Sequence, residues 1–271
     1  MHRGSFLHTD SMLIERTEYM SLLEKWRDKK IIKVVTGIRR CGKSSLLRMF
    51  KDKILTDGVS KEQVVELNFE DLDNEPLLNY KALHTYLKQR LQRDRMNYFF
   101  LDEIQMVDGF QKVIDSLFLL DNVDIYLTGS NAYLLSGEIA TLLTGRYVEI
   151  KMLPFSFREF THGLPAGTSA EDAYRKYIEN GSFPYIMQIE HDKEMVNEYL
   201  TGLYNTIVLK DVVSRRKITD VIMLQSVVRF LADNIGNISI IKRISDTMTS
   251  LGRKISAHTV ENYISALTDS Y

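Results

Sequence analysis

A short glycine-containing segment is the first place where residue types and their spacing indicate chemistry. GIRRCGKS, residues 37–44, matches the pattern G-x-x-x-x-G-K-[ST] of a phosphate-binding loop. Its glycines let main-chain N–H groups turn toward phosphate oxygens, its lysine can reach the β- and γ-phosphates, and its serine hydroxyl can bind Mg²⁺. The residues expected to bind the nucleotide are Gly37, Ile38, Arg39, Arg40, Cys41, Gly42, Lys43, Ser44 and Ser45.

The residues around this loop fit the same interpretation. The β-branched run IIKVVTG precedes it and predicts a buried strand, and an amphipathic helical pattern begins at Lys43. The free N–H groups and positive end of such a helix point at a bound anion. A chance match to the bare pattern occurs on the order of once per hundred chains, and the strand–loop–helix context makes chance a weaker explanation.

Two adjacent acids follow a second apolar run. In YFFLDE, residues 98–103, four apolar residues precede Asp102 and Glu103. Because the carboxyl ends of parallel strands meet at one sheet edge, a strand here would bring both acids to the phosphate loop. We expect Asp102 to hold Mg²⁺ with Ser44, and Glu103 to be the general base that activates the attacking water. Two solvated acids at a strand end are the alternative, which the loop about 60 residues upstream disfavours.

Small polar residues close another predicted strand, in LTGSN. Ser130 or Asn131 could contact the γ-phosphate or the attacking water, and a plain polar turn explains each residue about as well. Asn68, at the end of a further strand, could hold Glu103 in an inactive rotamer when substrate is absent. Asparagine is common at strand ends, however, so the structural explanation of Asn68 is favoured.

An arginine is expected to stabilise charge in the transition state. The candidates are Arg39, Arg40, Arg146, Arg215 and Arg216. We take Arg146 as the catalytic candidate and Arg215 as the next, although a solvated or ion-paired arginine is the commoner case. Cys41 could be a redox switch at a helix N-terminus, but a small filler residue is the better interpretation.

The elements that must position these residues follow from hydrophobic periodicity. Apolar and β-branched runs predict strands, and i, i+3, i+4 patterns predict helices between them. This alternation indicates a mostly parallel sheet covered on both faces. The predicted strands are residues 31–37, 64–70, 97–103, 123–129 and 146–152, and the predicted helices are 16–28, 43–55, 83–91 and 110–118.

The alternation stops near residue 160, and the rest of the chain has helical patterns. The unusual first residues suggest a leader or a mis-called start, and the helical pattern that runs up to Tyr271 suggests a truncation. We expect four parts, which are a leader at 1–12, a nucleotide-binding core at 13–165, a helical region at 166–234 and a helix-turn-helix segment at 235–271.

The last of these parts has the pattern of two helices joined by a turn. Gly252 lies in the expected turn, and Ser256 is the expected N-cap of the second helix. Helices that recognise DNA usually carry more positive charge, and Glu261 repels phosphate. DNA binding therefore remains an option that we do not favour, and a lid or interaction module is the alternative. The expected buried stripe is Val260, Tyr263, Ile264 and Leu267.

The composition disfavours several other classes of protein. The 271 residues carry 35 Lys and Arg against 36 Asp and Glu, so no net positive field favours bulk binding of polyanions. One cysteine excludes an internal disulfide and a multi-cysteine zinc site, and it favours a reducing compartment. No apolar run approaches the roughly 20 residues of a membrane span, so we expect a cytoplasmic protein without a membrane partner.

Several segments together resemble a known family. Prokaryotic AAA-type ATPases with an appended C-terminal domain of unknown function contain, in this order, stretches similar to GIRRCGKSSLL, FFLDEIQ, LTGSN, LLTGRYVEIKMLPFSFREF, NGSFPYIM and IVLKDVVSRRKI. The resemblance implies an α/β P-loop core of the AAA type with sheet order 5-1-4-3-2, followed by an all-α region with a winged helix. It implies ATP as the nucleotide and makes Ser130 or Asn131 the first sensor residue.

These observations lead to one expected activity and several alternatives. We expect an enzyme that binds ATP and Mg²⁺, hydrolyses ATP, and couples hydrolysis to a conformational change in an appended domain or a protein partner. A slow nucleotide-dependent switch or scaffold, a DNA-binding regulator and a small-molecule kinase are the alternatives. The pairing of Asp102 with Glu103 favours turnover over a switch, and activation of water over a kinase.

Overall fold

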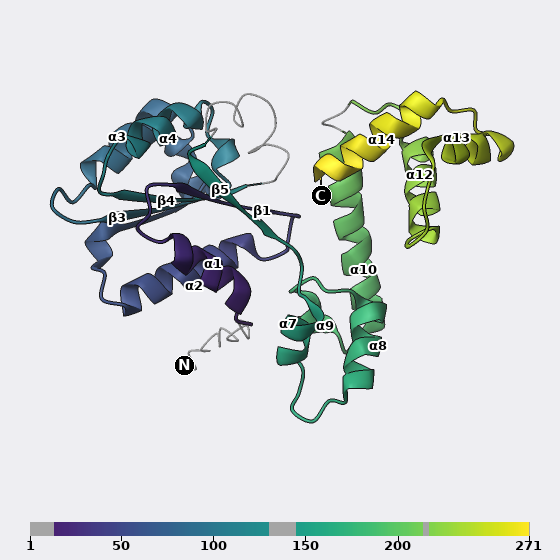
Figure 1. The fold of residues 1–271 in the computed structure, drawn as a ribbon, viewed down its shortest axis with the longest axis horizontal. Helices are drawn as coiled ribbons and strands as arrows, with labels where there is room; N and C mark the ends of the chain where they lie inside the picture. The colour runs from purple at the N-terminus through teal and green to yellow at the C-terminus, as the bar shows by residue number, and fades with distance from the viewer. Residues whose placement is uncertain (1–13, 130–144, 214–216, 271) are drawn as a thin grey trace, which may run out of the picture. The chain divides into compact units, whose positions relative to one another are not determined.

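A computed structural model describes residues 14–129, 145–213 and 217–270 of the chain (Figure 1). The chain divides into two compact units between Val196 and Asn197. The first unit holds a parallel β-sheet and its flanking helices, followed by a smaller group of helices. The second unit is helical throughout its described residues. None of the described helices is both long and apolar enough to span a bilayer.

The described residues of the first unit form a five-stranded parallel sheet in the order β2-β3-β4-β1-β5. This is the order that the family resemblance implied, read from the opposite edge, so that expectation is confirmed. All of the predicted strands are present, and their ends differ from the prediction by at most two residues. The strands are β1 Ile32–Gly37, β2 Val64–Asn68, β3 Asn97–Asp102, β4 Val123–Gly129 and β5 Tyr147–Met152.

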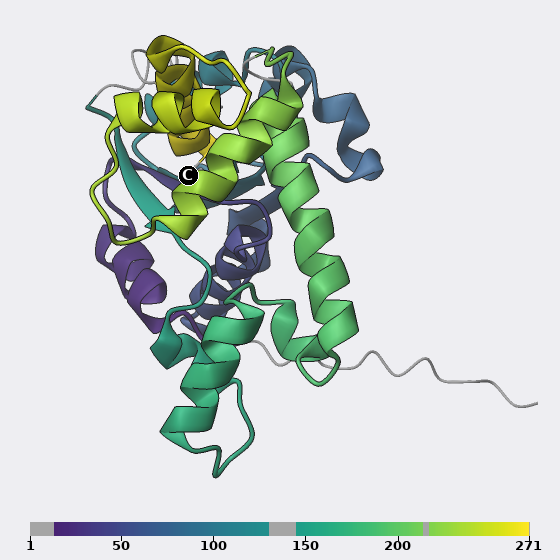
Figure 2. The same cartoon turned by 90° about the vertical axis from the view of Figure 1, so that its right-hand side faces the viewer.

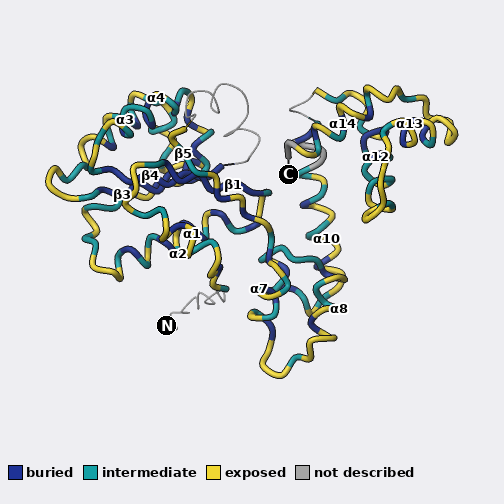
Figure 3. Tube along the Cα trace, viewed as in Figure 1, coloured by how far each residue is buried: buried dark blue, intermediate teal, exposed yellow. Residues whose placement is uncertain are grey.

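Helices cover both faces of this sheet, as the alternation of elements predicted (Figure 1). One face packs against α1 (Thr17–Trp26) and α2 (Lys43–Thr56), and the other packs against α3 (Tyr80–Gln89) and α4 (Phe110–Phe118). Strands β1, β3 and β4 are buried along their whole length because both of their faces are covered (Figure 3). Short 3₁₀ turns lie at Lys61–Gln63, Leu72–Leu77 and Ile104–Met106.

The buried face of α2 shows why the helix lies where it does. Leu46, Leu47, Phe50 and Ile54 recur at helical spacing and are all buried, in contact with side chains from the sheet. Opposite them, β1 contributes Val35 to the same core. The packing of α2 against β1 fixes the position of the loop between them, which is the predicted phosphate-binding loop.

A smaller group of helices follows the sheet within the first unit. The helices α7 (Phe157–His162), α8 (Ala170–Asn180) and α9 (Ile186–Ile189) follow β5, and α10 (Lys193–Tyr204) begins at the end of this unit. Ser156 caps α7 and forms a capping box with Glu159. The small core of this group is Phe155, Phe160, Leu164 and Ala173.

The second unit packs three further helices around its own apolar core. In Figure 2 these helices are yellow-green to yellow. A π-helical segment at Asn205–Val213 continues α10, and α12 (Val221–Asp233), α13 (Ile241–Ser250) and α14 (Ala257–Ser270) follow. The predicted turn holds Gly252 at a φ of +82°, and the Ser256 hydroxyl accepts the Thr259 N–H at 3.0 Å as an N-cap. The helical C-terminal region is therefore confirmed, and the winged helix stays a prediction.

Candidate nucleotide-binding site

The predicted phosphate loop lies between β1 and α2 and depends on its two glycines. A Cβ on Gly37 would lie 2.3 Å from the main-chain oxygen of Met152 on the neighbouring strand, so no larger residue fits without displacement of backbone. Gly42 has a φ of +103° and is the N-cap residue of α2, a conformation that residues with a Cβ rarely adopt. The loop therefore turns directly into the helix and presents the helix N-terminus to a bound anion.

Lys43 is the first residue of α2, directly after the turn of the loop, and its side chain is almost fully buried. Its ammonium donates to the main-chain oxygen of Gly37 at 3.0 Å and lies 3.7 Å from a carboxylate oxygen of Glu103. These contacts place the lysine of the loop beside the acid that follows β3, although 60 positions separate them in the sequence. Two of the residues predicted to work together are therefore neighbours in the structure.

Asp102 ends β3 and is buried at the same sheet edge. Its carboxylate accepts a hydrogen bond from the hydroxyl of Thr128 and another from Ser44. Burial raises the pKa of Asp102, and the two hydrogen bonds oppose that rise. Carboxylate and hydroxyl oxygens are ligands that suit Mg²⁺, which usually takes one or two carboxylates together with substrate phosphates. Within the described ranges, no group of three or more His, Cys, Asp or Glu side chains could hold a metal by itself.

Glu103 occupies an unusual backbone conformation. Its φ of +54° and ψ of +44° lie in the left-handed region, which costs free energy in a residue other than glycine and recurs at functional sites. Its N–H donates to the Thr128 hydroxyl oxygen at 2.9 Å, and its side chain, 14% exposed, contacts Lys43 and the amide of Gln105. The carboxylate is therefore held at the edge of the sheet where the loop lies.

Sequence reasoning missed two residues that organise this site. Thr128 contacts both neighbouring acids, because its hydroxyl donates to the Asp102 carboxylate and accepts the Glu103 N–H. Gln105 donates its amide to Glu103, and the buried amide oxygen of Gln105 has no hydrogen-bond partner. The LTGSN segment indicates polar chemistry at the end of β4, but its pattern does not single out Thr128 over the two polar residues that follow Gly129.

Of the remaining predicted residues, four lie outside the described residues and one makes a different contact. Ser130, Asn131, Arg215 and Arg216 lie outside the described residues. The side-chain oxygen of Asn68 accepts the Glu70 N–H at 2.9 Å, so the structure does not place this side chain on Glu103.

The loop residues between the glycines differ in exposure. Arg39 is exposed and lies 3.5 Å from a carboxylate oxygen of Glu70, and Arg40 is exposed with a φ of +69°. Cys41 is fully buried, and burial raises the pKa of its thiol. A raised pKa reduces the thiolate fraction, so the structure supports a filler residue over a redox switch at this position.

Arg146 is placed at the other edge of the sheet. Its main-chain oxygen accepts the N–H of Ile32 at 2.8 Å, at the amino end of β1, whereas the phosphate loop follows the carboxyl end of the same strand. Its guanidinium pairs with Asp115 at 3.1 Å and is about half exposed. The structure therefore places Arg146 away from the phosphate loop of its own chain. A role toward a neighbouring subunit stays a prediction.

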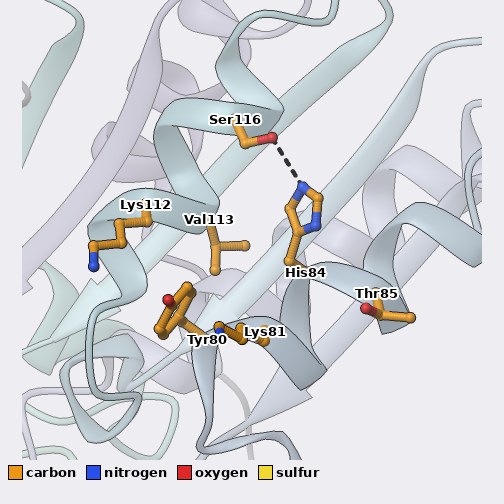
Figure 4. Close-up of a pocket in the computed structure, with 7 residues that line it drawn as sticks. All are labelled: Tyr80, Lys81, His84, Thr85, Lys112, Val113 and Ser116. Atoms are coloured by element: carbon orange, nitrogen blue, oxygen red, sulfur yellow. Dashed lines mark hydrogen bonds between the residues drawn. The ribbon is translucent and has the colours of Figure 1, made fainter.

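One cavity of about 430 Å³ lies away from these residues, on α3 and α4 (Figure 4). Its lining includes Tyr80, Lys81 and Lys112, and His84 hydrogen-bonds Ser116 at 2.9 Å. Helices α3 and α4 cover the face of the sheet opposite α2. The cavity is therefore separate from the phosphate loop, and we assign it no part in nucleotide binding.

The sheet order, the loop after β1 and the two acids at the carboxyl end of β3 define a P-loop NTPase fold of the AAA type. The comparisons with known proteins agree. Residues 29–161 match the family AAA_14, described as an AAA domain, and residues 171–271 match DUF8612, described as a domain of unknown function. The chain thus contains an AAA domain that matches this family and, after it, a C-terminal domain of unknown function.

Two relatives are named as uncharacterized proteins. One, from Haemophilus influenzae, is 37% identical over 263 residues, which are 96% of this chain and 65% of the relative. The other, from Methanocaldococcus jannaschii, is 32% identical over 255 residues, 89% of this chain and 55% of the relative. The chain therefore spans less than two thirds of the length of either relative.

Solved structures of AAA-type proteins are similar at low sequence identity. The Orc1 protein of Aeropyrum pernix in complex with DNA is 14% identical, with a TM-score of 0.43, and the match covers 96% of this chain and 84% of that protein. AMPPCP-bound DnaA of Aquifex aeolicus is 14% identical, with a TM-score of 0.44, and the match covers 93% of this chain and 86% of that protein.

Proposed function

We propose that this protein hydrolyses ATP with Mg²⁺ and uses hydrolysis to drive a conformational change in an appended domain or a protein partner. One observation carries the proposal. Lys43 and Ser44 of the loop contact Glu103 and Asp102, respectively, at the carboxyl edge of the sheet. A cation for phosphates, oxygen ligands for a metal and a carboxylate base therefore lie within one small volume.

Each of these residues has a role that its surroundings support. The phosphates would lie on the N–H groups at the start of α2, with Lys43 turned from the Gly37 oxygen toward the β- and γ-phosphates. Ser44 and Asp102 would hold Mg²⁺, which would neutralise charge on the phosphates. Glu103 would accept a proton from the attacking water, and Thr128 would keep both acids in place.

A slow nucleotide-dependent switch is the second candidate, and a specific contact favours it. The Glu103 carboxylate accepts a hydrogen bond from the Gln105 amide and lies beside the Lys43 ammonium. It must therefore leave these partners before it can accept a proton from water. If that exchange is slow, ATP would stay bound for long periods and the protein would act through its bound state. The two candidates share the binding site and differ in turnover number.

A steady-state ATPase assay tests the proposal. The wild type is compared with Glu103→Gln and with Glu75→Gln, an exposed acid on a 3₁₀ turn that serves as a control. We expect Glu103→Gln to bind ATP normally and to lose hydrolysis, because glutamine is nearly isosteric but cannot accept the proton. Wild-type turnover in Glu103→Gln would reject Glu103 as the base.

The same assay separates the remaining alternatives. ATP binding without measurable turnover by the wild type would favour the switch. Stimulation by added double-stranded DNA would favour a DNA-binding role for the C-terminal helices, which the exposed acid Glu261 disfavours.

A further inference from the structure

A buried arginine lies behind the phosphate loop and has no part in the proposed chemistry. Arg16 precedes α1 and is 2% exposed. Its guanidinium lies over two aromatic rings, with the ring centres of Tyr19 and Phe155 at 4.8 Å and 5.0 Å from the guanidinium carbon. A buried charge is costly unless it is fully hydrogen-bonded, so the partners of this group show what it holds together.

The side-chain nitrogens of Arg16 donate hydrogen bonds to three separate parts of the chain. Nη1 donates to the main-chain oxygen of Cys41 in the phosphate loop at 3.2 Å, and Nη2 donates to the oxygens of Leu153 and Pro154 after β5 at 2.7 and 3.5 Å. Nε donates to a carboxylate oxygen of Glu159 on α7 at 2.6 Å. The planar fork of a guanidinium can satisfy such divergent acceptors at once, which a lysine ammonium cannot do in the same geometry.

The contact with Cys41 orients the phosphate loop. In a trans peptide, the C=O of one residue and the N–H of the next point in opposite directions. Because Arg16 holds the Cys41 oxygen, the Gly42 N–H points away from Arg16. That N–H immediately precedes α2, where the free N–H groups of the helix would receive the phosphates.

Glu159 continues this network into the helices that follow the sheet. Its second carboxylate oxygen accepts the N–H of Ser156 at 2.8 Å and the Ser156 hydroxyl at 2.9 Å, which form the N-terminal cap of α7. One carboxylate therefore joins Arg16 to the first turn of α7. Hydrogen bonds run without a break from the phosphate loop through Arg16 and Glu159 to this helix.

The segment between β5 and α7 is held on its other sides as well. The Leu153 N–H donates to the hydroxyl of Tyr19 at 3.1 Å, and the Phe155 N–H donates to the Ser182 oxygen at 2.8 Å. Tyr177 of α8 donates its hydroxyl to the Phe155 oxygen at 3.0 Å. A movement of residues 153–155 would therefore be passed to both α7 and α8.

We propose that Arg16 is a positioning residue that couples nucleotide binding at the phosphate loop to helices α7 and α8 through Glu159. Phosphates that bind the loop would shift the Cys41–Gly42 peptide, and Arg16 would pass that shift to residues 153–155 and to the cap of α7. The inference rests on the proposed function, because it requires that the loop binds a nucleotide.

Hydrogen–deuterium exchange with and without a non-hydrolysable ATP analogue and Mg²⁺ tests this coupling. In the wild type, we expect the analogue to change exchange both in peptides that cover the loop and in peptides that cover residues 155–163. Glu159→Gln should keep the response at the loop and lose the response at 155–163. Its affinity for the analogue should stay within about threefold of the wild type, because the loop itself is intact.

A matched control variant and a second variant accompany this experiment. Glu190→Gln removes a carboxylate of similar exposure, 14% against 13% for Glu159, whose ion pair with Lys176 does not reach the loop. This control should keep both responses. Arg16→Lys retains the charge but loses the fork, so we expect it to weaken binding of the analogue about tenfold, as the loss of a hydrogen bond from a charged group would do.

The outcomes separate this inference from the proposed function. A loop that does not respond to the analogue in the wild type would overturn the proposed function, and the coupling with it. A response at the loop with none at 155–163 in the wild type would overturn the coupling alone. Wild-type responses at both places in Glu159→Gln and in Arg16→Lys would also overturn it.

Discussion

Lys33 on β1 and Asp124 on β4 form an ion pair in the interior of the sheet, with side chains that are 0% and 1% exposed. Asp124 also accepts the Tyr126 hydroxyl at 2.8 Å and the Asp28 N–H at 2.9 Å, and the Lys33 ammonium donates to the Lys29 oxygen at 3.1 Å. Burial lowers the pKa of Lys33 and raises that of Asp124, while their mutual attraction opposes both shifts. The pair is a structural feature, because both residues lie toward the amino ends of their strands.

The first prediction concerns this pair. Lys33→Met should destabilise the protein by about 3–5 kcal/mol, because it leaves Asp124 buried without its countercharge. The double variant Lys33→Met with Asp124→Leu should recover much of that loss, since an apolar pair needs no compensating charge. Denaturation in urea measures both effects, and a double variant no more stable than the single one would contradict this explanation.

The pH dependence of the single variant follows from the direction of the Asp124 shift. A carboxyl whose pKa is raised on folding binds protons more tightly in the folded state, so its contribution to stability is lost as pH rises through the raised pKa. Without Lys33, that pKa should rise further. The destabilisation of Lys33→Met should therefore be smaller at pH 5 than at pH 8, and equal values at the two pH values would argue against a charged Asp124.

A second prediction concerns the lysine of the phosphate loop. Lys43→Ala should weaken ATP binding at least about tenfold, because the loop loses the cation that faces the β- and γ-phosphates. Lys51→Ala provides a matched control, since Lys51 lies on the same helix but pairs with Glu66 at the surface. Calorimetry of both variants is decisive, and equal affinity in Lys43→Ala and the wild type would reject the loop as the nucleotide site.

Arg146 gives a third prediction, which depends on its place at the amino edge of the sheet. If its only role is the surface pair with Asp115, Arg146→Ala should keep kcat within about twofold and lose at most about 1 kcal/mol of stability. This is the result that the structure of a single chain leads us to expect. A loss of about 100-fold in kcat with unchanged affinity would instead indicate catalysis in a neighbouring subunit.

Mixing experiments distinguish catalysis in a neighbouring subunit from a structural effect on the chain that carries the Arg146→Ala substitution. Recovered activity in a mixture of Arg146→Ala and Lys43→Ala proteins would show that the arginine of one chain serves the loop of another. An inactive Arg146→Ala protein that no mixture restores would point to a structural effect on its own chain.

The fourth prediction uses the single cysteine of the chain. Because Cys41 is fully buried and burial raises the pKa of its thiol, a thiol-reactive dye should label the native protein very slowly at pH 8. Unfolding in guanidinium should expose one reactive thiol per chain. Rapid stoichiometric labelling of the native protein would revive the interpretation of Cys41 as a redox switch.

Much of the fold was determined by local sequence pattern. The β-branched run before Gly37 and the apolar run before Asp102 predicted strands that the structure contains, because residues buried on both faces of a sheet must be apolar. The loop motif fixed the position of Lys43 relative to α2, since a helix that begins directly after the loop sets that geometry over a few residues. These are short-range features, and a single sequence is enough to find them.

The contacts between residues that are distant in the sequence depended on which strands lie side by side. Thr128 meets Asp102 because β3 and β4 pair. Arg146 lies far from the loop because it precedes the amino end of β5, whereas the loop follows the carboxyl end of β1, the strand that pairs in parallel with β5. Arg16 reaches Glu159 across 143 positions, and no periodicity marks an arginine before a helix as buried. Strand order and side-chain burial are decided by the packing of the whole core, so contacts between such distant residues were decided only by the tertiary structure.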